Sequence, residues 1–108
     1  MRAQTRRMEK RIQMTLPVQL ESLKRPGPAE RTVTENVSSL GARVVTKRRR
    51  KRKEWLLVTL FQGDHLRLPA RVVYCQPLAG GRFGIGLKFQ GVTILWSDLP
   101  NNSSLMSS

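Results

Sequence analysis

The sequence is poor in the residues that build disulfides, metal sites and catalytic triads. Its 108 residues include one cysteine, Cys75, and one histidine, His65. A single cysteine excludes an intramolecular disulfide, and without a Cys/His cluster we predict no metal site. Ser38 has no credible histidine partner in the sequence. We therefore predict no catalytic residue and expect a binding module instead of an enzyme.

Long apolar runs are also missing. No stretch approaches the ~20 consecutive apolar residues of a membrane-spanning helix. The N-terminus is basic but lacks the apolar core of a secretory signal. We therefore expect no transmembrane segment and a cytoplasmic location, and a lone cysteine fits such a reducing compartment.

Acidic residues are scarce. Seven Asp and Glu face twenty Lys and Arg, for a formal net charge of +13. This excess favours anionic partners, among them nucleic acid, anionic lipid and phosphorylated small molecules. Most of the cations fall in two runs, because residues 1–12 carry five of them and residues 47–53 (KRRRKRK) carry seven.

Apolar residues recur with a period of two along most of the chain, and this period indicates half-buried β-strands. One expected strand places Leu66, Leu68, Ala70, Val72 and Tyr74 on the same face. Pro, Gly, Asn and Ser separate the strands at intervals typical of a barrel or sandwich. We expect an all-β fold, a six-stranded antiparallel split barrel without a long C-terminal helix, with strands at 16–21, 30–37, 42–46, 54–61, 66–75 and 83–89.

The charge runs and the polar ends divide the chain into three parts. Residues 1–12 are expected to form a flexible basic arm, because closely spaced like charges destabilise a helix. Residues 13–96 form the predicted barrel, and residues 97–108 a flexible tail. The run 47–53 lies between two strands, so we expect it in a solvated loop.

Three short motifs stand out in this frame. The first is Arg7-Met-Glu-Lys-Arg11, followed by Pro17-Val18. The second is Asn36-Val-Ser38-Ser-Leu-Gly41, and the third is Gly84-Ile-Gly86-Leu-Lys-Phe89 on a late strand. In this order they resemble the PilZ family, whose pattern is RxxxR, a Pro-Val strand, [D/N]xSxxG and a late G-hydrophobic-G-x-x-F strand. The resemblance covers about residues 6–90.

The resemblance implies a bacterial receptor for the second messenger cyclic di-GMP. Arg7 and Arg11 would bind phosphate and the Hoogsteen edge of guanine, because a guanidinium presents five donors in a planar fork. Asn36 would meet guanine N–H groups and Ser38 would lie near base or phosphate. Gly41 would allow a tight turn or a close approach. Arg6 precedes the motif, at a position that influences whether one or two ligand molecules bind.

With such a ligand, the charge and flexibility of the arm predict a mechanism, in which the ligand neutralises the mobile arm and orders it against the barrel. A protein partner, which the sequence does not identify, would then read the new surface. Many PilZ proteins continue into a C-terminal helix, but residues 91–108 show no helical period. Val92, Ile94, Leu95 and Trp96 would either cover the barrel end or dock a partner.

Simpler interpretations exist for each feature. The basic arm is also typical of a solvated tail, and Asn, Ser and Gly are common in ordinary turns. The alternative function is a small basic barrel that binds nucleic acid electrostatically through the 47–53 loop.

Overall fold

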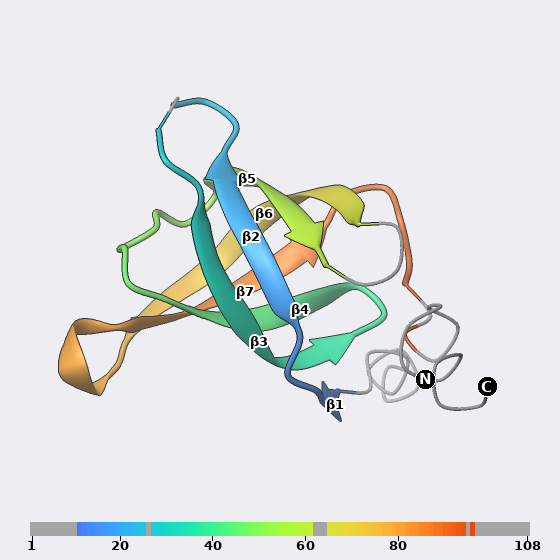
Figure 1. Cartoon of the computed structure of the whole chain (residues 1–108), viewed down its shortest axis with the longest axis horizontal. Coiled ribbons are helices and arrows are strands. Elements are labelled where there is room, and N and C mark those ends of the chain that lie inside the picture. Colours follow the sequence, from blue (N-terminus) through green and yellow to red (C-terminus); the bar gives the residue numbers. More distant parts are fainter. Residues whose placement is uncertain (1–10, 26, 62–64, 95, 97–108) are drawn as a thin grey trace, which may run out of the picture.

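The computed structural model describes residues 11–25, 27–61, 65–94 and 96, so the expected arm up to residue 10 and the tail 97–108 lie outside the described residues. Its strands form one antiparallel sheet (Figure 1). They are β1 (Ile12–Gln13), β2 (Pro17–Ser22), β3 (Glu30–Ser38), β4 (Gly41–Thr46), β5 (Trp55–Leu60), β6 (Leu66–Pro77) and β7 (Phe83–Phe89), with a single-turn 3₁₀ helix η1 (Ala79–Gly81) before β7.

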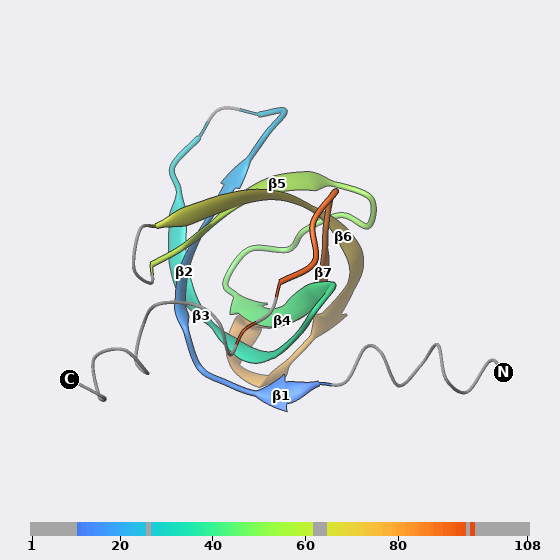
Figure 2. The same cartoon turned by 90° about the vertical axis from the view of Figure 1, so that its right-hand side faces the viewer.

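The six longer strands close into a barrel. Their order is β3-β2-β5-β6-β7-β4, and the additional pairing of β3 with β4 joins the two edges. Figure 2 shows the strands wrapped around a common interior. The six-stranded antiparallel barrel expected from the sequence is thus confirmed. The short strand β1 is an addition, and it pairs with the end of β3 through Ile12–Val37 and Gln13–Asn36.

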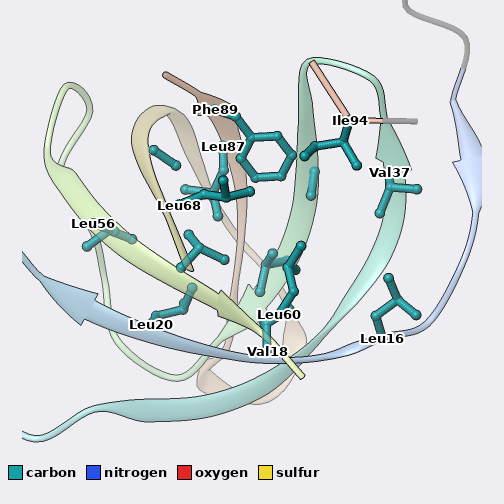
Figure 3. Close-up of a cluster of buried hydrophobic side chains, with 14 of the residues drawn as sticks. Leu16, Val18, Leu20, Val37, Leu56, Leu60, Leu68, Leu87, Phe89 and Ile94 are labelled. Carbon is teal, nitrogen blue, oxygen red and sulfur yellow. The ribbon is translucent and has the colours of Figure 1, made fainter. Parts of the chain in front are cut away.

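Alternate residues of the strands fill the barrel (Figure 3). Leu20 and Leu56 are fully buried, as are Val37, Val44 and Ile85. Burial of one such side chain contributes about 1.5–3 kcal/mol. β5 lies between β2 and β6, so both of its edges are hydrogen-bonded. Its nearly continuous apolar run places Leu56, Val58 and Leu60 in the core, while Trp55 and Leu57, which alternate with them, are partly buried.

The segment after β7 covers one barrel end. Ile94 and Trp96 are buried in the core. The Trp96 indole Nε1 donates to the carbonyl of Ser38 at 2.6 Å, and the Ile94 amide donates to the carbonyl of Ser39 at 2.8 Å. The sequence left open whether this segment covers the barrel end or docks a partner, and Ile94 and Trp96 cover the barrel end. They also hold the β3–β4 turn in place.

Thr34 positions the chain that enters the barrel from the N-terminal side. Its buried hydroxyl donates to the Met14 carbonyl at 2.6 Å and accepts from the Leu16 amide at 2.9 Å. A second backbone bond runs from the Thr34 amide to the Leu16 carbonyl at 2.9 Å. The stretch 14–16 is therefore fixed to β3, and it directs Arg11 toward the far end of that strand.

Two local features differ from the sequence prediction. The pairing of β6 with β7 shifts register between Val72 and Tyr74, which marks a β-bulge. The bulge turns Tyr74 away from the face of Leu68 and Val72, so the predicted strict alternation is wrong at this point. In the loop 47–53, six cations are exposed as expected but Arg50 is buried.

No helix in the described part of the chain is long and apolar enough to span a membrane.

Candidate ligand-binding site

The site begins with a contact between two motifs that lie far apart in the sequence. Arg11 Nη1 donates a hydrogen bond to Asn36 Oδ1 at 2.7 Å. Arg11 is the second arginine of RxxxR, and Asn36 opens Asn-x-Ser-x-x-Gly. Both side chains keep contact with solvent. The bond uses one of the five guanidinium donors and holds the remaining four in a defined orientation above the barrel surface.

The pairing register places two rows of mostly polar residues and glycines on the outer face of β3, β4, β7 and β6. One row across the strands runs Asn36, Arg43, Gly86, Tyr74. The neighbouring row runs Ser38, Gly41, Lys88, Arg71. These residues share a face because side chains alternate along a strand and their sequence neighbours on β3, β4 and β7 are core residues.

A pocket of about 140 Å³ lies between the two rows. Arg11 and Lys88 both line it, so two cations border a small polar depression. Its wall is built from residues of RxxxR, of Asn-x-Ser-x-x-Gly and of the strands β6 and β7. They include Arg11, Ser38, Gly41, Tyr74, Gly86 and Lys88.

The match to a known family covers the residues that build this pocket. Residues 5–95 match the family model for the PilZ domain. This chain belongs to the PilZ family. PilZ domains are binding and adaptor domains, associated with cyclic di-GMP signalling and with protein partners.

Two solved PilZ structures are similar to this chain. The PilZ domain of CeSA, from a cellulose-synthesizing bacterium, is 28% identical with a TM-score of 0.58, over 73% of this chain and 79% of that one. The Bacillus subtilis inhibitor of motility MotI (DgrA) is 17% identical with a TM-score of 0.62, over 78% of this chain. This chain spans 42% of the length of MotI, and at that identity the likeness shows the fold alone. No curated protein sequence matches this chain.

Position 41 of the PilZ motif must be glycine, because β4 and β7 approach each other too closely there for a side chain. A Cβ atom at this position would lie 1.9 Å from the carbonyl oxygen of Leu87 on β7. That oxygen belongs to the backbone and cannot move without separating β4 from β7. Gly41 therefore lets the β3–β4 turn press against β7 and forms the floor of the pocket.

Ser38 precedes this glycine at the tight turn. It is buried, and its hydroxyl accepts a bond from the amide of Leu40 at 3.3 Å. Its carbonyl is held by Trp96. The turn that carries Ser38 and Gly41 is thus held by a bond within the turn and by a bond from the buried Trp96.

The glycines of the late PilZ strand make room for two side chains on the outer face. A Cβ atom on Gly86 would lie 2.2 Å from the Tyr74 ring, and one on Gly84 would lie 2.5 Å from Arg43 Nη2. The ring of Tyr74 can therefore lie against β7 beside the pocket. The spacing of these glycines was part of the sequence motif, but which side chains occupy the space was not evident from it.

Arg43 on β4 bonds to side chains of β3 and β6, so it joins three strands on this face. It donates to Glu35 Oε1 at 2.7 Å, to the Tyr74 hydroxyl at 3.0 Å and to Gln76 Oε1 at 3.0 Å. The hydrogen bonds to Glu35 and then to Tyr74 raise the pKa of the Arg43 guanidinium above its ordinary value. Arg43 therefore stays charged at every pH at which a binding experiment is run, and it fixes the orientation of the Tyr74 ring.

The structure brings together four of the six predicted site residues. Arg11 and Asn36 are bonded, and Ser38 and Gly41 line the pocket with Arg11. Arg6 and Arg7 lie outside the described residues. Sequence reasoning missed Tyr74 and Arg43, and it named Lys88 only as part of a motif. Within the described residues no group of three or more His, Cys, Asp or Glu side chains could hold a metal ion.

Proposed function

We propose that this PilZ chain is a receptor for cyclic di-GMP in bacterial second-messenger signalling. The binding residues in this proposal are Arg6, Arg7, Arg11, Asn36, Ser38 and Gly41. The observation that carries it is the bond between Arg11 and Asn36, which joins the two PilZ motifs at one pocket. The proposed role is that of a non-enzymatic adaptor, which passes the signal to a protein partner.

The proposal assigns a contact to each group around the pocket. The free donors of Arg11 bind a phosphate and the O6 and N7 acceptors of a guanine. Asn36 offers its amide to the same base while it holds Arg11. Lys88 adds a second positive charge for the other phosphate. The Tyr74 ring, held by Arg43, supplies a flat surface on which a purine can stack.

The small volume of the pocket supports the proposal that the N-terminal arm contributes to ligand binding. Ligand sites enclose volumes of about 300–1,000 Å³. The pocket of about 140 Å³ holds only a portion of a dinucleotide. In the proposed mechanism the arm, with Arg6 and Arg7, folds over the remainder of the ligand. The two phosphates neutralise its cations, and the surface so formed is read by the partner.

A titration calorimeter experiment on the full chain tests the proposed ligand. We expect cyclic di-GMP to bind about a hundredfold more tightly than GMP or GTP, because only a ligand with two guanines and two phosphates can use Arg11, Lys88 and the arm together. Run at protein concentrations well above the dissociation constant, the titration also gives the number of ligands per chain, which we propose Arg6 influences. Equal affinities for the three nucleotides, or no binding of cyclic di-GMP, would remove the proposal.

A further inference from the structure

The fold carries a second cleft, at the barrel end away from the β3–β4 turn. It lies between the loop that joins β2 to β3 and the loop that joins β4 to β5; the first loop projects at the top of Figure 1. Its volume is about 590 Å³. We name it the basic cleft, because its wall contains Lys24, Arg25 and the whole of residues 48–53, with Glu54 as its acidic member.

Two carboxylates, those of Glu30 and Glu54, stabilise the conformation of the loop that joins β4 to β5. Glu30 accepts from the Lys47 amide at 2.7 Å and from Arg50 Nη2 at 3.2 Å. Glu54 accepts from the Lys51 amide at 2.9 Å and pairs with Arg50 Nη1 at 3.5 Å. Arg50 is 5% exposed, so it acts as an internal anchor. The basic run thus has a defined conformation against the barrel.

The remaining cations of the cleft are not neutralised by the fold. Lys24, Arg25 and the other basic residues of 48–53 are exposed. Among the described residues, the ion pairs involve only Arg43, Arg50 and Arg67. A structure that holds so many like charges around one hollow has a strong local positive potential, and this potential favours an anion from outside.

We propose that the basic cleft binds an acidic, extended segment of a partner protein. Its volume suits a ligand the size of a few residues. Most of its cations are arginines, whose planar forks match the two oxygens of an Asp or Glu carboxylate. The aliphatic stems of these side chains, with Pro28, supply an apolar wall for the peptide between its charges. This partner site goes beyond the proposed ligand site and does not depend on it.

The shape of the cleft favours a peptide over the other polyanions. A nucleic-acid duplex carries its phosphates on a broad convex surface, which a hollow of this size does not admit. Single strands are held mainly by stacking on aromatic rings, and no aromatic residue lines the cleft. A flat membrane surface would contact the exposed side chains of the two loops but would leave the hollow between the loops unfilled.

The test compares two triple variants of the full chain that carry the same net charge. The cleft variant combines Lys24→Gln, Arg25→Gln and Arg48→Gln. The control combines Arg31→Gln, Arg67→Gln and Arg82→Gln, three exposed cations that do not line the cleft. The probe is a fluorescein-labelled, glutamate-rich peptide, followed by fluorescence anisotropy in the absence of cyclic di-GMP.

We expect the cleft variant to bind the peptide about tenfold more weakly than the parent, because three ion pairs are lost. The control is expected to change the affinity by less than about twofold, since a matched loss of distant charge acts only through screened fields. Equal losses in both variants, or no peptide binding by the parent, would overturn the proposal. It would also be overturned if a short DNA duplex or phosphatidylserine vesicles bound more tightly than the peptide in a way that required the same three residues.

Discussion

The substitution Arg11→Ala is expected to weaken cyclic di-GMP binding by about a hundredfold, or ~2.7 kcal/mol. Arg11 projects its free donors over the pocket, and a hydrogen bond to a charged group contributes about 1.5–3 kcal/mol. The side chain is exposed, and within the part of the chain that the structure describes it bonds to Asn36, so the loss should appear in binding and leave the free energy of unfolding nearly unchanged. Titration calorimetry and chemical denaturation of the same variant measure the two effects.

Two further variants separate the charge of Arg11 from the contacts around it. Asn36→Ala keeps that charge but removes both the 2.7 Å anchor of Arg11 and the proposed amide contact with guanine, and we expect a smaller loss of about tenfold. Arg67→Ala removes an equally exposed cation on β6 that does not line the pocket, and its binding should match that of the parent. If Arg67→Ala weakened binding as much as Arg11→Ala, net charge alone would account for the affinity, and the pocket would have no specific part in it.

The substitution Gly41→Ala is expected to lower the free energy of unfolding by about 3 kcal/mol, which is large for the addition of one methyl group. The new Cβ would lie 1.9 Å from the Leu87 carbonyl oxygen, so β4 and β7 must move apart to admit it. The pairing of β4 with β7 forms the part of the barrel wall that lies next to the pocket. Chemical denaturation followed by tryptophan fluorescence gives the change in stability.

Gly27→Ala is the matched control for this experiment. Nothing lies within 4 Å of a Cβ atom built on Gly27. We expect no loss of stability there, and a gain of up to about 1 kcal/mol from the reduced freedom of the unfolded chain. A Gly41→Ala variant as stable as Gly27→Ala would show that the two strands are not in the close contact described, and the floor of the pocket would have to be revised.

The sequence was sufficient to predict the strands because their apolar residues keep a regular period. β7 spans Phe83–Phe89 as expected, and the bounds of β3 and β4 differ from expectation by one residue. The placement of Arg11 and Asn36 at one site was also predicted, but only through the family resemblance; their direct hydrogen bond is a finding of the structure. Nothing in the local sequence shows that two motifs 25 residues apart meet on one face.

The features that the sequence could not reveal depend on a local irregularity of one strand pair or on contacts between residues far apart in the sequence. The bulge before Tyr74 turns that ring outward. The sequence gives no sign of the bulge, because Val72, Val73 and Tyr74 all have the high β-propensity of a regular strand. Arg50 is one of seven adjacent cations, and only the positions of Glu30 and Glu54 in the folded barrel select it for burial. Arg43 was unremarkable for the same reason, since its partners come from other strands.

The central claim is that cyclic di-GMP binds where the two PilZ motifs meet. The most direct measurement is a titration of the isotopically labelled chain with cyclic di-GMP, followed by NMR chemical shifts. We predict the largest changes at the side-chain amide of Asn36 and at the backbone amides of Arg11, Ser38 and Gly41, with little change at Gly27 and Lys53 of the basic cleft. Large shifts confined to the basic cleft, with Asn36 and Gly41 unaffected, would contradict the assignment.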